Sequence, residues 1–434
     1  PGDALYDHAR TIFYGGIDRR PAAIARVADA DDVARVVNLA RQSGMELAVR
    51  SGGHSAAGFG VSNGGLVIDL RDMRALEIDA DHRTAWAETG LTAGEYTAAA
   101  GVYSLATGFG DTATVGIGGI TLGGGVGFLS RKVGLTIDSL VAADVVTADG
   151  KLVRADSFNN PDLFWAIRGG GGNFGVATRF QFRLHPISTA VGGMLILPAT
   201  PEVIANFIAE AQAAPEELTT IANIMPAPPM PFLPAEIHGK LVLMALMMYA
   251  GDIEAGEKAV ARFRQLATPL ADMLHAMRYP EIFQPEDSSY HPTAVSRTLY
   301  VNDVDRTSAE TILQHLRAGD GAFRVAQLRV LGGAVSRVPV EETAYAHREA
   351  RIMVGLVSFY NGEAERAARQ AWVDEFAAAL PRKTAGAYVN FIDGAGLNLI
   401  QDAYPGKTGQ RLAQIKARLD PDNLFRVNHN IKPQ

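Results

Sequence analysis

The sequence predicts a mixed helix-and-strand protein with two domains, and three observations support this prediction. The chain has 434 residues, which corresponds to two or three domains at roughly 100–200 residues each. Residues 22–50 show a strand, helix, strand pattern that is typical of α/β units. Near Pro186 the glycine clusters of the first part stop, and helices then alternate with strands and polar loops. We therefore expect one domain over 1–186, a second over 187–385, and a C-terminal segment over 386–434.

In the first domain, apolar residues recur with helical spacing over Asp31–Ser43, between strands predicted at Ala22–Val27 and Glu46–Arg50. An Asp-Gly turn separates apolar runs and predicts a hairpin. A helix with Asn160 as N-cap and Pro161 at its first position follows. The further strands predicted here are Leu66–Leu70, Leu140–Thr147, Lys151–Arg154 and Val176–Leu184.

In the second domain, Thr200-Pro201-Glu202 opens a helix whose apolar residues share one face. Met225–Pro234 is proline-rich and predicts a loop. Further helices are expected at Ser308–Arg317, Glu363–Leu380 and Thr408–Leu419, the last followed by a turn over Asp420–Asn423. Further strands are expected at Lys240–Tyr249, Phe323–Leu331 and Ala387–Phe391.

The composition excludes several classes of protein. The net charge is −7 and no basic runs occur, so nucleic acid is a poor partner. The absence of cysteine excludes disulfides, zinc–thiolate sites and a cysteine nucleophile. No His/Asp/Glu group has metal-ligand spacing, and no apolar run reaches the ~18–20 residues that span a bilayer. We expect no metal, no membrane and a cytoplasmic location, with export after removal of an N-terminal signal left open.

Glycine is unevenly distributed, and its clusters are the strongest functional signal. The 45 glycines include Gly52, Gly53, Gly58 and Gly60, nine residues between Gly108 and Gly127, and the run Gly169–Gly172. Backbone N–H groups in tight glycine turns form anion sites that suit a pyrophosphate. One cluster alone is equally well explained as a turn, but three together favour a long cofactor such as FAD. A nicotinamide site is disfavoured, because the G-x-G-x-x-G string at Gly170–Gly175 follows a predicted helix and precedes a strand.

His54 lies inside the first cluster. A histidine after two glycines is more often structural, but the glycines leave its ring room to meet a cofactor. Neutral imidazole is nucleophilic and can bond covalently to an electrophilic methyl group.

The motif around His54 resembles the covalent-flavin loop of the vanillyl-alcohol-oxidase superfamily, in its berberine-bridge-enzyme-like branch. The resemblance covers about residues 20–185 and the last fifty residues. Bacterial members of the family are among the proteins that the chain resembles. It rests on these segments: Arg50-Ser51-Gly52-Gly53-His54-Ser55, Thr114-Val115-Gly116-Ile117-Gly118-Gly119, Ser130-Arg131-Lys132-Val133-Gly134-Leu135, Asp162-Leu163-Phe164-Trp165-Ala166 through Gly175, and Asp420-Pro421-Asp422-Asn423-Leu424-Phe425.

The resemblance implies the α+β class. A split PCMH-type FAD-binding domain receives the C-terminal segment, and a substrate domain places an antiparallel sheet, backed by helices, over the flavin. His54 is then the covalent attachment site. The other cofactor-binding residues that the resemblance implies are Arg50, Ser51, Gly52, Gly53, Ser55, Thr112, Thr114, Val115, Gly116, Gly118, Gly119, Asn173, Val176 and Asn428.

The chain departs from the family pattern at Thr112. Many members attach the flavin a second time through a cysteine at this position, which this chain lacks. The resemblance therefore implies a single bond, from His54 to the 8α methyl of FAD, and a somewhat less oxidising flavin.

Tyr388 and Asn390 are the candidate catalytic residues. On a strand, side chains two residues apart point the same way. By resemblance, the tyrosine of this Tyr-x-Asn pair acts as base or substrate anchor, and a base role requires that its pKa fall from ~10. The alternative is a packing tyrosine. The second tyrosine of some relatives is absent, because Val126 and Val133 stand at its possible positions.

Further residues are assigned by the same resemblance. Val115 favours oxygen access to the flavin, and Arg348, next to His347, more often fixes structure. One or two of five polar aromatics are expected to line the pocket: Tyr290, His291, Tyr300, Tyr360 and His429.

The leading hypothesis is an oxidase that takes two hydrogens from a small alcohol, sugar, phenol or amine and reduces molecular oxygen to hydrogen peroxide. Three alternatives stay open: a dehydrogenase with another acceptor, a flavin-loaded binding protein, and a bond-forming enzyme that uses the oxidised product. The substrate and the oligomeric state are not predicted.

Overall fold

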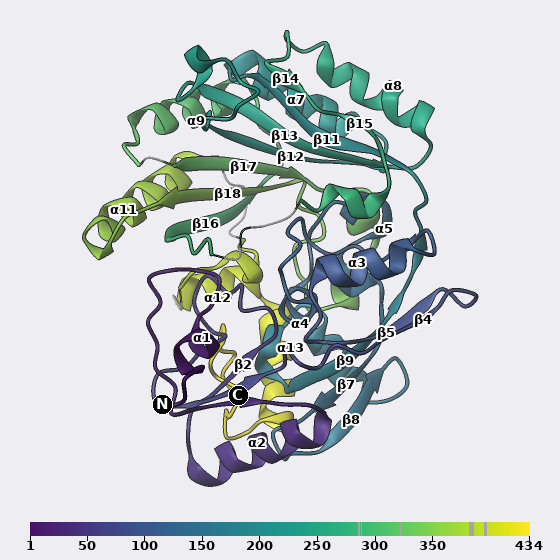
Figure 1. The fold of residues 1–434 in the computed structure, drawn as a ribbon, viewed down its shortest axis with the longest axis vertical. Coiled ribbons are helices and arrows are strands. Elements are labelled where there is room, and N and C mark those ends of the chain that lie inside the picture. The colour runs from purple at the N-terminus through teal and green to yellow at the C-terminus, as the bar shows by residue number, and fades with distance from the viewer. Residues whose placement is uncertain (285–286, 288, 322, 382–385, 395–396) are drawn as a thin grey trace.

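The computed structural model describes residues 1–284, 287, 289–321, 323–381, 386–394 and 397–434, with 397–398 described in the backbone only. Two halves stack along the long axis of the molecule (Figure 1). Both chain ends lie in one half, and the central residues form the other. The described helices include none that is long and apolar enough to cross a membrane.

A small parallel sheet begins the first half. It has the order β1-β3-β2, with β1 at Ala23–Arg26, β2 at Leu47–Arg50 and β3 at Leu66–Asp69. Helix α2 (Ala30–Ser43) connects β1 to β2, capped at its start by the Asp29 carboxylate and ended by Gly44 at φ 67°. Its apolar stripe packs on this sheet, so the predicted strand, helix, strand unit is confirmed.

A five-stranded antiparallel sheet completes the first half. Its order is β4-β5-β9-β7-β8, and the predicted hairpin is β7 and β8. The bounds are β4 Leu76–Asp79, β5 Thr84–Glu88, β7 Leu140–Val146, β8 Leu152–Asp156 and β9 Val176–Arg183. The other elements here are α1 Tyr6–Arg10, α3 Ala93–Gly101, α4 Ile117–Gly123, α5 Ser130–Val133, α6 Pro161–Ile167, and the short pair β6 Leu105–Ala106 and β10 His185–Pro186.

The predicted start of α6 is confirmed, with Asn160 as N-cap and Pro161 as first residue, but the cap lacks a side-chain bond. Asn160 stands at the N-cap position of α6, but its backbone is left-handed (φ 48°) and its side chain makes no capping bond. The Nδ2 group instead donates to the Arg154 carbonyl, 2.7 Å away, because the tight turn after β8 directs the side chain backwards.

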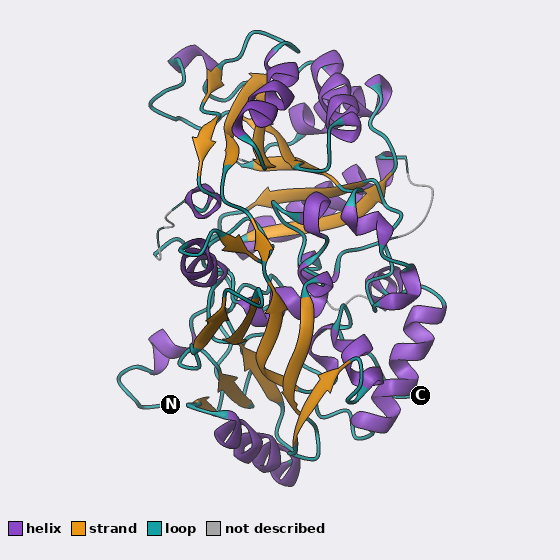
Figure 2. Cartoon of the chain, turned by 90° about the vertical axis from the view of Figure 1, so that its right-hand side faces the viewer, coloured by secondary structure: helices purple, strands orange, loops and turns teal. Residues whose placement is uncertain are grey.

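An eight-stranded antiparallel sheet forms the other half, in the order β14-β11-β13-β12-β17-β18-β16, with β15 also paired to β11. Helices cover its outer face, and the opposite face looks toward the first half (Figures 1 and 2). The strands are β11 Ala190–Pro198, β12 Leu218–Pro226, β13 Leu241–Ala250, β14 Ala271–Asp272, β15 His275–Met277, β16 Ala294–Val301, β17 Arg324–Val330 and β18 Ile352–Phe359. The helices are α7 Pro201–Ala213, α8 Ile253–Arg264, α9 Arg306–Ala318, α10 Ala334–Arg337 and α11 Glu363–Ala379. Strand β12 runs through Pro226, two residues into the predicted loop.

Strand periodicity decides which side chains look toward the first half. Ala326, Leu328 and Val330 of β17 join the core beneath the helices. The alternate residues Gln327 and Arg329 therefore lie on the opposite face, directed at the first half.

The C-terminal segment returns to the first half (Figure 1). It contains α12 (Leu397–Ala403) and α13 (Lys407–Leu419), and residues of α13 join the core of the five-stranded sheet. The strand predicted at Ala387–Phe391 is wrong, because Val389–Phe391 form a 3₁₀ turn. This segment has no ladder partner and docks on β16 through side chains, such as Thr298 Oγ1, which accepts from Tyr388 N at 3.2 Å.

Candidate functional site

Two glycine segments meet backbone to backbone where β2 ends. A Cβ on Gly52 would lie 2.2 Å from Gly116 N, and one on Gly116 would lie 2.1 Å from Gly52 N. The Ser51 hydroxyl locks the junction by donating to Thr89 O at 2.5 Å and accepting from Gly118 N at 3.2 Å. The first two glycine clusters therefore lie against each other and form one platform.

His54 lies on this platform in a defined orientation. Its ring stacks on Phe13 with centroids 4.2 Å apart and an interplanar angle of 19°. Its Nε2 lies 3.0 Å from Thr114 Oγ1. Removal from water lowers the pKa of His54 to about 4, against a smaller opposing effect of the Thr114 backbone. The imidazole is therefore neutral at physiological pH and keeps a nucleophilic lone pair.

At two glycines beside this platform, neither the backbone conformation nor the surrounding protein atoms require glycine. Gly119 lies within α4 and Gly172 within the third cluster. Neither has a positive φ, and a Cβ on either would meet nothing within 4 Å. Glycine inside a helix costs about 0.5–1 kcal/mol relative to alanine. The open space at both positions fits the close approach of a bound cofactor, so the residues present suit FAD.

The C-terminal tail joins the third cluster. Asn173 is buried, donates to Gly170 O and His429 O, and accepts from Ile431 N at 2.9 Å. Asn428 donates to Gly172 O at 3.2 Å, while its buried Oδ1 has no partner among the described residues. Asn173 is thus occupied in holding the tail, whereas the Asn428 carbonyl remains available to a ligand.

Lys416 anchors the same tail from α13. Its Nζ donates to Asp420 Oδ2 at 2.5 Å, Asn173 O at 2.7 Å and Phe425 O at 2.9 Å. The Asp420 carboxylate also accepts from Leu424 N and Phe425 N, which closes the predicted turn. Both charged side chains have no exposed surface, so this ion pair fixes where the tail lies.

Tyr388 and Asn390 meet although they are not on a strand. The buried Tyr388 hydroxyl accepts from Asn390 Nδ2 at 2.9 Å, Gly125 N at 2.8 Å and Val126 N at 3.3 Å. Burial raises the pKa of Tyr388, and these donors together with the Arg329 charge oppose the increase without cancelling it. The lowered pKa that a base requires is therefore not found, and the phenol keeps its proton near neutrality.

A polar cluster that the sequence prediction missed lies nearby. Arg329 donates through Nη2 to Asp111 Oδ2 at 2.5 Å and through Nε to Gln327 Oε1 at 2.8 Å. Gln327 in turn donates to Asn223 Oδ1 at 2.9 Å. Arg329 Nη1 is buried without a partner among the described residues, and the guanidinium lies 5.4 Å from the Phe391 ring. Two polar residues at alternate positions of an apolar strand were the signal that could have identified it.

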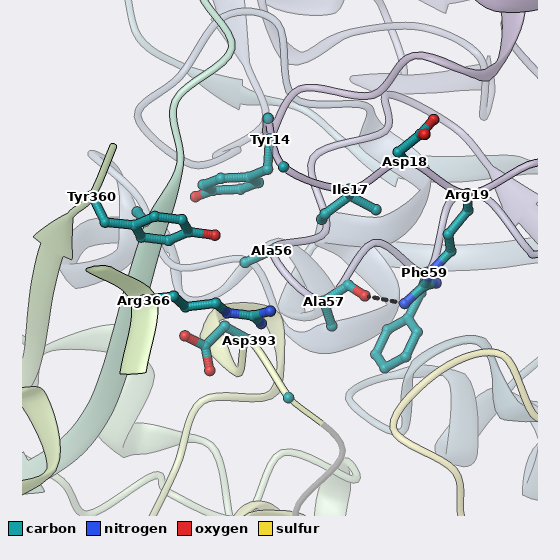
Figure 3. Close-up of a pocket in the computed structure, with 14 residues that line it drawn as sticks. Tyr14, Ile17, Asp18, Arg19, Ala56, Ala57, Phe59, Tyr360, Arg366 and Asp393 are labelled. Carbon is teal, nitrogen blue, oxygen red and sulfur yellow. Dashed lines mark hydrogen bonds between the residues drawn. The ribbon is translucent and has the colours of Figure 1, made fainter. Parts of the chain in front are cut away.

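A cavity of about 350 Å³ is lined by Ala56 and Ala57, which follow His54 in the chain, and by residues of both halves (Figure 3). Tyr14, whose ring contacts Phe13 edge-on at 5.1 Å, and Tyr360 both line it. Arg366 and Asp393 lie below the two rings, and Ala56 and Ala57 of the His54 loop form another wall. A second cavity, of about 390 Å³, shares Arg19 and Phe59 and is lined by tail residues that include Asn428. Of the five polar aromatics considered above, Tyr360 is thus one that lines a cavity.

Several predicted residues lie apart from open space. The Arg50 guanidinium is buried against Asp69, with 2.6 Å between Nη2 and Oδ2. Val176 is buried in the core beside the tail. Ser55 closes its own turn by accepting from Phe59 N, and Thr112 Oγ1 donates to Asp111. Val115 is half-buried, and its carbonyl accepts from Ala93 N. What these residues contribute to a cofactor stays a prediction.

Arg348 has a structural position, as expected. It is buried and forms a bidentate ion pair with Asp138, with both N–O distances 2.8 Å. Its neighbour His347 stacks on Tyr300 at 4.6 Å, and the Tyr300 hydroxyl contacts Tyr345 at 2.9 Å. Tyr290 is 56% exposed and contributes nothing to either cavity.

Comparison with known proteins agrees with this geometry. Residues 21–156 match the model of the FAD binding domain, and residues 387–432 match the model described as berberine and berberine like. An FAD-linked oxidoreductase of Bacillus subtilis (strain 168) is 29% identical over 99% of this chain and 95% of its own length. The (R)-6-hydroxynicotine oxidase of Paenarthrobacter nicotinovorans is 28% identical over 100% and 96%.

Solved structures show the same fold. The crystal structure of 6-hydroxy-D-nicotine oxidase from Arthrobacter nicotinovorans superposes with a TM-score of 0.88, at 25% identity, over 100% of this chain and 97% of that one. A berberine-bridge-enzyme-like protein of Physcomitrella patens has the same TM-score at 23% identity, over 100% and 96%. These matches confirm the α+β class with a berberine-like architecture. The chain thus carries one segment that matches an FAD binding domain and one that matches the berberine-like model, and over its full length it is similar to FAD-linked oxidoreductases.

Proposed function

We propose that the protein is an oxidase that carries FAD on one covalent bond to His54 and oxidises a small organic alcohol, sugar, phenol or amine. The observation that carries this proposal is the neutral, oriented imidazole at the junction of two glycine segments. When bound, FAD takes two electrons from the substrate and passes them to molecular oxygen, so that the substrate loses two hydrogens and oxygen leaves as hydrogen peroxide.

His54 supplies the electron pair for the bond to the 8α carbon of FAD. We assign Nε2–H as the donor to Thr114 Oγ1, an assignment that leaves the lone pair on Nδ1. Bond formation would release one proton from the methyl group and one from the imidazole, and the two electrons would be accepted by dissolved oxygen, which would leave as hydrogen peroxide. The chain contains no cysteine for a second bond.

Tyr388 orients the substrate rather than accepting its proton. Gly125 N and Asn390 Nδ2, with a longer contact from Val126 N, occupy the lone pairs of its oxygen, so its own O–H is the group we assign as donor to an oxygen or nitrogen of the substrate. Because burial raises the pKa of this phenol, the hydroxyl stays a donor over the physiological range. The substrate hydrogen that does not travel with the electron pair leaves to water.

The cavity between Tyr14 and Tyr360 is our candidate for substrate entry. It lies directly beside the His54 loop, and its hydroxyl, guanidinium and carboxylate groups can both donate and accept hydrogen bonds. Oxygen as the acceptor is supported by Val115 beside Gly116 and by relatives that are named as oxidases, including a xylooligosaccharide oxidase of Thermothelomyces thermophilus that is 28% identical.

The first experiment is acid precipitation of the purified protein. We expect the yellow colour to remain with the polypeptide and the mass of FAD to be found on the His54 peptide, whereas His54→Ala retains only dissociable flavin. Flavin that washes out of the unchanged protein would contradict the covalent bond, and a colourless protein that takes up no FAD would contradict the whole proposal. Hydrogen peroxide formed during turnover separates an oxidase from a dehydrogenase.

A further inference from the structure

The N-terminal residues 11–16 run between the two halves of the molecule beside His54. Arg50 Nη1 donates to Thr11 O at 3.3 Å, and Phe13 N donates to Gly53 O at 3.2 Å, so this segment is fixed to the glycine loop. On its other side, Gly15 N donates to Pro292 O at 2.9 Å, and His291 Nδ1 lies 3.1 Å from Phe13 O. Phe13 therefore contacts both halves of the molecule, and these contacts fix its position.

Phe13 and Thr114 together restrict the imidazole in two different ways. The stack at 4.2 Å and 19° fixes the plane of the ring. The contact between Nε2 and Thr114 Oγ1 fixes the rotation of the ring within that plane. Together, the two contacts leave one orientation for Nδ1, the other ring nitrogen.

We propose that Phe13 is a positioning residue for flavin attachment, because it holds the face of the His54 ring so that Nδ1 points to the incoming methyl carbon. This inference rests on the proposed covalent bond at His54 and deepens it. An aligned nucleophile reacts faster than one that must first be ordered, without binding its partner more tightly. Phe13 itself forms no bond to FAD and exchanges no proton or electron.

The test follows covalent attachment in full-length protein that is produced with limiting riboflavin and then given FAD in air. Acid-stable flavin is measured against time at several FAD concentrations. For Phe13→Leu, which keeps apolar bulk but loses the stack, we expect the saturated attachment rate to fall by about two- to thirteenfold, from the 0.5–1.5 kcal/mol value of an aromatic pair. The FAD concentration for half-maximal rate should stay unchanged. Phe13→Tyr, which keeps the stack, should attach at the rate of the unchanged protein.

Phe158→Leu is the matched control, since Phe158 is 92% exposed and far along the chain from the site. Thermal melting of each flavin-free variant checks folding, and Thr114→Val, which removes the second restraint, should slow attachment in the same way if Phe13→Leu is unstable. Equal saturated rates for Phe13→Leu and the unchanged protein would overturn this inference while leaving the covalent bond intact. Slow attachment by Phe13→Tyr as well would also overturn it, because stacking would then not be the cause. If the unchanged protein binds FAD but never attaches it, the proposed bond fails and this inference fails with it.

Discussion

Tyr388 shows how a single hydroxyl can be assigned a role by its surroundings. Its oxygen receives three N–H groups while burial raises its pKa, a combination that suits a fixed hydrogen-bond donor. A base at this position would need the opposite balance, with the charged form favoured.

Substitution of Tyr388 by Phe should slow flavin reduction by the substrate about 10²-fold, as for the loss of one oriented hydrogen-bond donor. In the unchanged protein the reduction rate should stay flat between pH 6 and 9, because the phenol is protonated throughout. Anaerobic stopped-flow bleaching of the flavin measures both quantities.

The matched control for this experiment is Tyr96→Phe, which removes a buried hydroxyl that contacts Thr107 at 3.0 Å in the core. It should leave the rate of flavin reduction unchanged. A rate in the unchanged protein that climbs tenfold per pH unit would show that Tyr388 acts as a base and would contradict the anchor role.

At the scale of elements, the return of the C-terminal tail depends on α13. Lys416 and Asp420, one turn apart and without exposed surface, connect this helix to Asn173 and to the last residues of the chain. Burial lowers the pKa of Lys416, and the adjacent carboxylate opposes this effect. Removal of one charge of such a pair leaves the other buried and unpaired.

Lys416→Met should therefore lower the free energy of unfolding by about 3–5 kcal/mol. Because Asn173 loses its bond to the helix, the same change made in the His54→Ala protein, whose flavin is dissociable, should also make FAD leave more readily. Urea unfolding and FAD release at neutral pH test this expectation. The exposed ion pair between Arg418 and Asp162 offers the control, since Arg418→Met should cost at most about 1 kcal/mol. Equal costs for the two variants would disprove a special role of the buried pair.

Most helices and strands could be predicted because their signals lie within the element itself or at its ends. Helix α2 has an Asp cap, an apolar stripe and a terminal glycine, and the hairpin of β7 and β8 has its Asp-Gly turn. The strand predicted at Ala387–Phe391 is wrong because the prediction used local signals alone. Its alternating residues favour a strand, but whether a neighbouring strand pairs with it depends on the tertiary structure.

The site was predictable only in part. The glycine platform and His54 stand in contiguous motifs, but the contact between Arg329 and Asp111 joins residues 218 positions apart. Phe13 likewise reaches His54 from a segment without any motif. Such contacts are set by how the two halves stack, which no local pattern encodes.

At the scale of the whole molecule, the buried His429 and the half-buried His185 make stability depend on pH. Removal from water lowers the pKa of His185, with help from Arg183 and Lys132, and lowers the pKa of His429; both fall to about 4. In the unfolded chain a histidine has a pKa near ~6.5. Between these values the unfolded chain binds more protons, so stability is complete above about pH 6.5 and is lost as the pH falls toward 4.

The free energy of unfolding, measured in urea between pH 7 and 4, should accordingly change with pH. Its slope at pH 5 should correspond to about two protons that these residues take up on unfolding. His429→Gln should reduce this uptake by about one proton, whereas His82→Gln, at a histidine whose side chain is 81% exposed, should not. A slope that is the same in all three proteins would contradict the assignment.

The junction of Gly52 and Gly116 also limits how this protein can be engineered. Each position excludes a side chain because the other backbone occupies the space, so neither substitution can compensate for the other. A variant library that includes these two positions would consist largely of inactive clones. Diversity is better placed at Tyr14, Tyr360 and Arg366, whose side chains border open space and can change size without moving the platform.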